Sequence, residues 1–422
     1  MNTPATQEEK NQLVIFLTLI LFFAGMATDI YIPSLPHITT VFNTTPGRAG
    51  FSLSIYVIAA SISGLGAAIF SDHYGRKPTL HISCIIFIIS TACITLSQSI
   101  NFFIFFRMLQ GFAAGLYWII TRQILNDLLN EKEQINANTT VSTAYVLSPA
   151  IAPIIGAYIA EYTSWRLCFV LILFLQIFVF FWIRKFFKES LSVKKKIPHP
   201  VTFFGSFLMF FLRKDFNAAM IISSSAFGGY FAFLTISSFI FIEKLNFSKA
   251  SFSSIFFVLS GLYLLGNYAT RFLNNRNYSK NKIIFYGIIC NFTGSAVLGL
   301  TFFSNNIFFT SAVIITGAIL MRLGLGLMMA LSQIFVMNIF KKSSGLALGT
   351  LNLFQSMFAG IATFWVTSFT NSILGLFIVC IVFNGVGILA YKIFYSNFKF
   401  PNLKYKVLKK MLKKDSLKSF LE

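Results

Sequence analysis

The sequence predicts an all-α membrane protein with twelve transmembrane helices arranged as two pseudo-symmetric six-helix bundles. Of its 422 residues, 56% are hydrophobic and 11% are charged, whereas soluble domains carry roughly 25% charged residues. The mean hydropathy is +0.74. Twelve apolar runs can be marked along the chain, and a basic connection divides them six and six, the pattern of two pseudo-symmetric bundles.

Each apolar run is close to the roughly twenty residues that a helix needs to cross a bilayer. The first run has no small-residue cleavage site and is followed by further spans, so we expect it to be the first helix rather than a signal peptide. The expected spans are residues 12–32, 50–70, 79–98, 102–125, 136–160, 166–187, 217–241, 251–271, 283–303, 312–338, 344–368 and 372–395.

Positive charge is concentrated on one side of these spans. With the N-terminus in the cytoplasm, 28 of the 34 Lys and Arg residues, Arg122 among them, fall in cytoplasmic segments. This asymmetry follows the positive-inside rule. It predicts a bacterial inner-membrane protein with both termini in the cytoplasm. The net charge of +21 does not indicate nucleic-acid binding, because the charges lie between apolar runs and form no aromatic-basic module.

The predicted organisation has four parts: an N-terminal bundle (1–187), a cytoplasmic linker (188–216), a C-terminal bundle (217–395) and a basic tail (396–422). Within the linker, Val201–Leu212 is too short to span and is expected to form an interfacial helix. The tail is either a regulatory segment or a solvated segment attracted to anionic lipid.

Residue types that build catalytic or metal sites are scattered. The five cysteines lie in apolar runs, and the four histidines lie near loops or helix ends. We therefore expect no metal, no cofactor and no enzymatic activity. A membrane enzyme or sensor would need an interfacial acid, histidine or metal cluster.

The turn after the second span reads Asp72-His-Tyr-Gly75-Arg76-Lys77-Pro78. Glycine permits a tight turn with positive φ. The carboxylate of Asp72 can accept hydrogen bonds at the start of a neighbouring helix. This turn resembles motif A of the major facilitator superfamily, although Ala68 and Phe70 replace the usual glycine and leucine.

Three further stretches resemble one branch of that superfamily, the Bcr/CflA-type drug:proton antiporters. They are the segment Asp29–Pro36, the segment Arg107–Gly111 in helix 4, which is similar to motif B, and the segment Ser148–Ala157 in helix 5, which is similar to the antiporter motif C. Ala152 and Ala157 depart from the usual motif C glycines.

The resemblance implies a monomer that exports small molecules, such as chloramphenicol- or bicyclomycin-like antibiotics, in exchange for protons. It implies cargo bound near the bilayer midplane between two rocking bundles. The residues expected to gate this motion are Asp72, Gly75, Arg76, Lys77, Pro149, Pro153 and Gly156. The prolines bend helix 5 and the glycine permits close packing, which are structural roles as well.

Asp29 is an acid inside an apolar span, where a carboxylate is costly unless it is paired or protonated. It is either a proton carrier, the role that the resemblance implies for the matching acid, or a structural carboxylate near the outer interface. Arg107 is either its partner or an arginine that reaches the interface. Gln110, one turn later, continues the polar face.

Arg322 in helix 10 is either a cargo-facing charge or an interfacial arginine. If it faces the cavity, two arginines outnumber one aspartate, which favours anionic or zwitterionic cargo. Other candidates for cargo contact are Tyr31, Trp118, Asn352 and Gln355. For aromatic residues, including Tyr56 and Tyr230, packing or lipid contact is the alternative.

Two other transport functions stay open. The chain could export an endogenous anionic metabolite such as a siderophore, or it could import a nutrient together with protons. The proline-rich motif in helix 5 favours export.

Overall fold

The computed structural model describes residues 7–191, 207–276, 278–304, 306–340 and 343–395. Twelve helices in these ranges are long and apolar enough to cross a membrane. The described residues contain no β-strand. The predicted all-α membrane architecture is confirmed.

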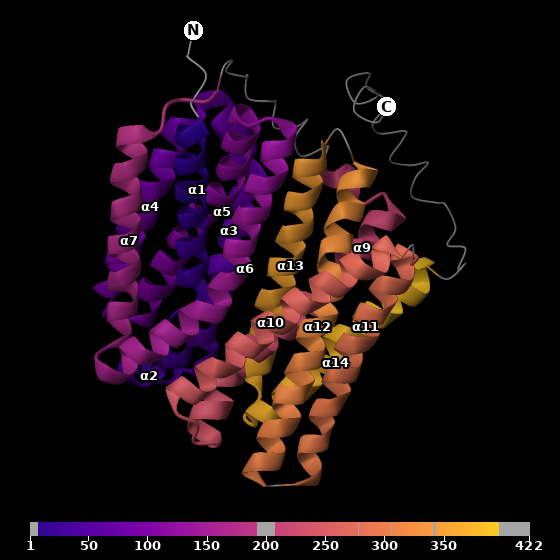
Figure 1. Ribbon diagram of the computed structural model, residues 1–422. Coiled ribbons are helices and arrows are strands. Elements are labelled where there is room, and N and C mark those ends of the chain that lie inside the picture. The colour runs from indigo at the N-terminus through magenta and orange to yellow at the C-terminus, as the bar shows by residue number, and fades with distance from the viewer. Residues whose placement is uncertain (1–6, 192–206, 277, 305, 341–342, 396–422) are drawn as a thin grey trace.

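The helices of the first half lie side by side as one bundle, drawn from indigo to magenta in Figure 1. They are α1 (Gln7–Asp29), its continuation α2 (Leu35–Val41), α3 (Pro46–Tyr74), α4 (Arg76–Thr95), α5 (Ile100–Leu128), α6 (Glu131–Tyr162) and α7 (Trp165–Phe186). We name the two ends of the molecule after α2, which lies at one end, and Gly75, which lies at the other: the α2 face and the Gly75 face.

The second half forms the other bundle in Figure 1. Its elements are α9 (Lys214–Ser238), which continues as a π-helix (Phe239–Lys244), α10 (Lys249–Asn275), α11 (Lys280–Val297), which continues as a 3-10 helix (Leu298–Phe303), α12 (Ile307–Ile339), α13 (Ser344–Ser368) and α14 (Ser372–Tyr395). The predicted linker limits, 188–216, stay a prediction. Most of the predicted interfacial helix lies outside the described residues, although 207–210 are helical.

The first span differs from its prediction. The α-helix ends at Asp29, and the chain continues through a 3-10 turn (Ile32–Ser34) into α2. Pro33 and Pro36 cause this break, because proline has no N–H to donate within a helix. The whole span runs from Lys10 to Val41, so it extends well beyond the predicted end at residue 32.

The two halves share local detail at one matching turn. Asn43 has φ of 46° and precedes the Thr45 cap of α3, while Asn246 has φ of 55° and precedes the Ser248 cap of α10. Asparagine is one of the few residues that tolerate left-handed backbone. The same turn therefore starts the second helix of each half, as expected for an internal repeat.

The bundles contact each other mainly through α3 with α13 and α6 with α10. Ser54 Oγ lies 2.6 Å from Thr363 Oγ1, and Ser61 Oγ lies 2.7 Å from Ser356 Oγ. At the α2 face, Lys249 Nζ donates to the Ala160 carbonyl at 2.9 Å. Hydrogen bonds between small hydroxyl side chains let α3 and α13 approach closely.

Candidate functional site

Asp29 is the last residue of α1 and lies deep in the first span. It is 6% exposed. Since the span continues to Val41, twelve residues separate Asp29 from the α2 face. Asp29 is thus buried inside the bundle, within the first span as the sequence predicts, and not at the outer interface that was the alternative.

Arg107 of α5 lies beside the end of α1 and is fully buried. Its Nη1 donates to the Ala27 carbonyl at 2.9 Å and to Gln110 Oε1 at 2.6 Å. Gln110 Nε2 in turn donates to Thr91 Oγ1 at 2.7 Å. The Ala27 carbonyl is available because the last carbonyls of a helix have no intrahelical donor. The break after Asp29 thus creates the acceptor that holds Arg107.

The Arg107 guanidinium also lies over aromatic rings, of which those of Tyr31 and Tyr56 are nearer than that of Phe169 at 5.8 Å. Its Cζ is 4.8 Å from the Tyr31 ring centroid and 4.4 Å from that of Tyr56. Both phenol hydroxyls are hydrogen-bonded. Tyr31 Oη lies 2.7 Å from Ser52 Oγ, and Tyr56 Oη donates to the Ala24 carbonyl at 2.7 Å. Fixed rings stabilise a buried cation through their π faces. We call Arg107, Tyr31 and Tyr56 the N-cage.

Arg322 of α12 has a matching environment in the second bundle. Its Cζ lies 4.3 Å from the Tyr230 ring centroid and 4.6 Å from that of Tyr263. We call Arg322, Tyr230 and Tyr263 the C-cage. The N-cage comes from the turn after α1, from α3 and from α5, and the C-cage comes from α9, α10 and α12. These are the first, second and fourth spans of each half, so the cages are related by the internal repeat.

Arg322 lies deeper in its own helix than Arg107 does. Arg107 is eight residues from its helix cap at Ser99, whereas Arg322 is sixteen residues from its cap at Asn306. Eight residues correspond to about 12 Å along a helix. Arg322 is therefore near the middle of α12, where a substrate site between two repeats is expected.

The positive charges of both caged arginines act on the Asp29 carboxyl group. The turn that follows Asp29, Ile32–Ser34, contacts α9 and α10, the helices that carry Tyr230 and Tyr263. Asp29 therefore interacts with Arg322 of the opposite bundle as well as with Arg107. Within the described residues, no ion pair shorter than 4.0 Å joins Asp29 to an arginine. The acid thus stands between two cations without direct contact to either.

The remaining cargo candidates have other partners. Trp118 packs 4.8 Å from the Tyr145 ring and lies under the Arg122 guanidinium at 4.4 Å. Arg122 lies in the last two turns of α5, which continues to Leu128, and its assignment to the cytoplasmic side stays a prediction. In the second bundle, Gln355 donates to Ser223 Oγ at 3.1 Å, and the Asn352 carbonyl accepts from Ser61 Oγ at 3.3 Å.

The turn at the Gly75 face is held by an ionic network. Gly75 has φ of 110°, which favours glycine. The Arg76 guanidinium donates to Asp72 at 2.6 Å and to Asp127 at 2.8 Å. Glu189, and not Asp72, caps the start of α4: it accepts the backbone N–H groups of Arg76 and Lys77 at 3.0 and 3.1 Å.

Two of these acids, Asp127 and Glu189, were missed in the sequence. They lie 51 and 113 residues from Arg76, in segments without a recognisable spacing to the turn. The only signal was that both follow directly after long apolar runs, where an acid meets the ends of neighbouring helices.

The α6 segment supports the end of α1. Pro149 and Pro153 lie inside this helix. A Cβ on Gly156 would collide with the Ile30 carbonyl, so glycine is what allows α6 to touch the chain one residue after Asp29. The motif C glycine therefore positions the break that carries the acid.

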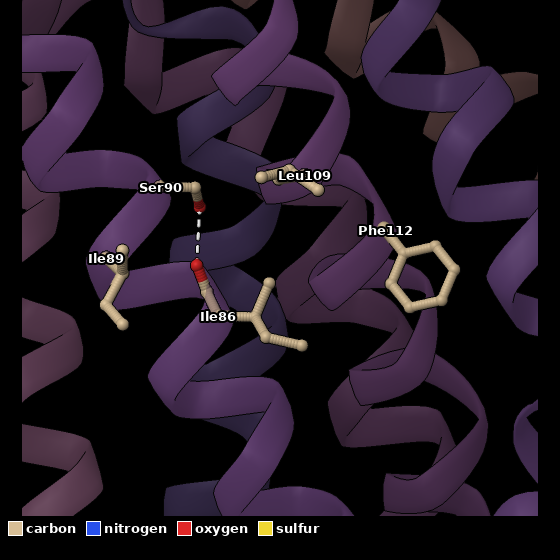
Figure 2. Close-up of a pocket in the computed structure, with 5 residues that line it drawn as sticks. All are labelled: Ile86, Ile89, Ser90, Leu109 and Phe112. Atoms are coloured by element: carbon tan, nitrogen blue, oxygen red, sulfur yellow. Dashed lines mark hydrogen bonds between the residues drawn. The ribbon is translucent and has the colours of Figure 1, made fainter.

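A pocket of about 320 Å³ also lies between α4 and α5 (Figure 2). Its lining residues are Ile86, Ile89, Ser90, Leu109 and Phe112. The Ser90 hydroxyl donates to the Ile86 carbonyl at 2.7 Å, so its only polar side chain is already engaged. This lining suits lipid chains and not a charged cargo.

Comparison with known proteins identifies the superfamily. The profile of the Major Facilitator Superfamily matches residues 17–363. The bicyclomycin resistance protein homolog of Haemophilus influenzae is 26% identical over 56% of this chain and 60% of its own length. Multidrug resistance protein D of Escherichia coli is 23% identical over 66% of this chain and 69% of its own. The chain thus matches about 60 to 70% of the length of these relatives.

Solved structures share the fold. A bacterial homologue of the lysosomal transporter Spinster, in an inward-facing and unoccupied conformation, superposes with a TM-score of 0.72 at 13% identity, covering 93% of this chain and 97% of the other. The D-xylose-proton symporter has a TM-score of 0.69 at 13% identity, covering 92% and 97%. The predicted family resemblance is confirmed.

Proposed function

Because the chain belongs to the major facilitator superfamily, we propose that it is a proton-coupled exporter of small molecules such as antibiotics. As a member it is a membrane transporter and not an enzyme. Two of its relatives are named for resistance to bicyclomycin and to multiple drugs. The observation that carries the proposal is Asp29, an acid held inside the bundle between two caged arginines.

The exchange rests on competition for Asp29. When the acid is ionised, its charge is balanced by the fields of Arg107 and Arg322, and it attracts a cationic group of the cargo. When it is protonated, that attraction is lost. Proton and cargo then exclude each other, which is the requirement for antiport.

The membrane orientation follows from the positive-inside rule. We propose that the basic Gly75 face is cytoplasmic, that both termini lie there, and that the protein works as a monomer in the bacterial inner membrane. The bundles touch at the α2 face through Lys249 and Ala160, and this contact supports closure toward the outside in the proposed orientation. The proton gradient is the only energy source required.

The residues of the Gly75 turn would act as a gate. Arg76 joins the ends of α3, α4 and α5 through Asp72 and Asp127, so the cytoplasmic ends of the first bundle move as one body. When the bundles rock, contacts between them break, while the contacts within each bundle are kept.

A second candidate function is the export of an endogenous anionic metabolite such as a siderophore. The observation that favours it is the second arginine, since two cages face one aspartate. The two candidates share the fold and the orientation, and they differ in cargo charge.

Inside-out vesicles with a pH gradient test the proposal. Wild-type protein should accumulate drug when the interior is acidified, and Asp29→Asn should lose this pH-driven transport. The control is Asp215→Asn, because Asp215 is exposed and pairs only loosely with Arg213 at 3.5 Å. Proton-driven accumulation by a well-folded Asp29→Asn protein would overturn the proposal.

A further inference from the structure

Arg322 has an unsatisfied hydrogen-bond donor at a buried site and could bind a ligand there. Its side chain is 8% exposed, its Nε is buried without a hydrogen-bond partner, and its guanidinium lies between Tyr230 and Tyr263. Leaving a charged donor unpaired in a buried site costs free energy. An anionic group that accepts from this guanidinium would remove that cost.

Arg107 is similar in part, because its Nε and Nη2 are also buried without a hydrogen-bond partner. Its Nη1, however, donates to the Ala27 carbonyl and to Gln110, and the side chain is fully buried. Its role is to fix the chain at the end of α1 beside Asp29. Arg322 is 8% exposed and donates no hydrogen bond within the described residues, so of the two caged arginines it is the one that a cargo can reach.

The charges around Asp29 decide what kind of cargo fits both Arg322 and proton exchange. Besides the two arginines, the titratable groups that interact with Asp29 are Tyr31, Tyr56, Tyr145 and Tyr230. The tyrosines are neutral in their ordinary state. The cluster therefore carries one net positive charge when Asp29 is ionised and two when it is protonated.

A purely anionic cargo gives the wrong coupling. Its charge would repel ionised Asp29 and so favour protonation, and proton and cargo would bind together instead of exchanging. A purely cationic cargo competes with the proton but leaves Arg322 unpaired and is repelled by it. Only a cargo with both charges satisfies the two groups at once.

We infer that the transported molecule is a zwitterion whose anionic group binds Arg322 while its cationic group replaces the proton on Asp29. This inference rests on the proposed proton exchange. Asp29 belongs to α1 and Arg322 to α12, so such a molecule bridges the two bundles. Its release from one of them is then linked to their separation.

Three matched probes test the inference on the purified full-length protein. Norfloxacin is a zwitterion at neutral pH, its ethyl ester is a cation, and its N-acetylpiperazine derivative is an anion. Wild-type protein should bind norfloxacin most tightly. Norfloxacin and the ester should release protons on binding, and the anion should take protons up.

Variants test which residue binds which charged group of the probe. Arg322→Gln should weaken norfloxacin binding about tenfold, the effect of one charge-assisted hydrogen bond, and leave or improve binding of the ester. Arg48→Gln is the control, because Arg48 is exposed and contacts Asn101 near the α2 face. Equal affinity of norfloxacin and its ester for wild-type protein, or unchanged norfloxacin binding in Arg322→Gln, would overturn the inference. Failure of the proposed exchange itself would show separately, as proton-driven transport by Asp29→Asn.

Discussion

Asp29 and Arg322 belong to opposite bundles, yet the charge of Arg322 acts on Asp29 as that of Arg107 does from the same bundle. The protonation of one acid therefore changes the attraction between the two moving bodies. Arg107 fixes the chain at the end of α1 through the Ala27 carbonyl. Arg322 links Asp29 to the second bundle.

The first prediction concerns the packing of α6 on α1. Gly156→Ala places a Cβ against the Ile30 carbonyl and should displace the chain next to Asp29. We expect a loss of about 1–3 kcal/mol of stability, typical of overpacking, and a large loss of transport. Thermal unfolding in detergent and vesicle transport would measure the two effects.

Gly261→Ala is the matched control, because a Cβ there meets nothing within 4 Å. It should keep wild-type stability and transport. Wild-type behaviour of Gly156→Ala would show that the contact with α1 is not needed.

The second prediction concerns the cap of α4. Glu189→Gln removes the negative charge that faces the N–H groups of Arg76 and Lys77. A charge at a helix N-terminus contributes typically 0.3–1 kcal/mol. We expect a small decrease in melting temperature and a several-fold slower transport, while drug affinity stays the same.

Glu161→Gln serves as its control, since Glu161 is exposed at the end of α6. A lower drug affinity in Glu189→Gln, with an unchanged transport rate, would place Glu189 at the cargo site instead of the gate.

The third prediction separates the charge of Arg107 from its shape. Lysine keeps the charge but lacks the planar group that lies over Tyr31 and Tyr56 and donates to two acceptors. Arg107→Lys should therefore lose most transport. Replacing Arg184, at the exposed end of α7, by lysine should have no effect, and full transport by Arg107→Lys would mean that charge alone is sufficient.

The sequence predicted the membrane architecture because hydropathy and charge asymmetry are imposed by the bilayer itself. It singled out Asp29, Arg107 and Arg322 for the same reason, since a charge in a span is costly. It did not reveal the cages, because Tyr56, Tyr230 and Tyr263 have no distinguishing local signal in a chain with 17% aromatic residues.

Long-range contacts were also beyond prediction. Glu189 caps a helix that begins 113 residues earlier, and no periodicity connects the two. The end of the first span was misplaced because Pro33 and Pro36 mark a break in the helix, whereas the chain continues in the same direction through α2.

Direct measurement of proton release is the sharpest test of competition at Asp29. Purified protein in weakly buffered detergent solution would be mixed with the cationic norfloxacin ethyl ester, and a pH-indicator dye would report the protons released. We predict that wild-type protein releases protons in proportion to bound ester, whereas Asp29→Asn binds with reduced affinity and releases none. Equal proton release by Asp29→Asn, or binding to wild-type protein without any release, would contradict the exchange of proton and cargo at this acid.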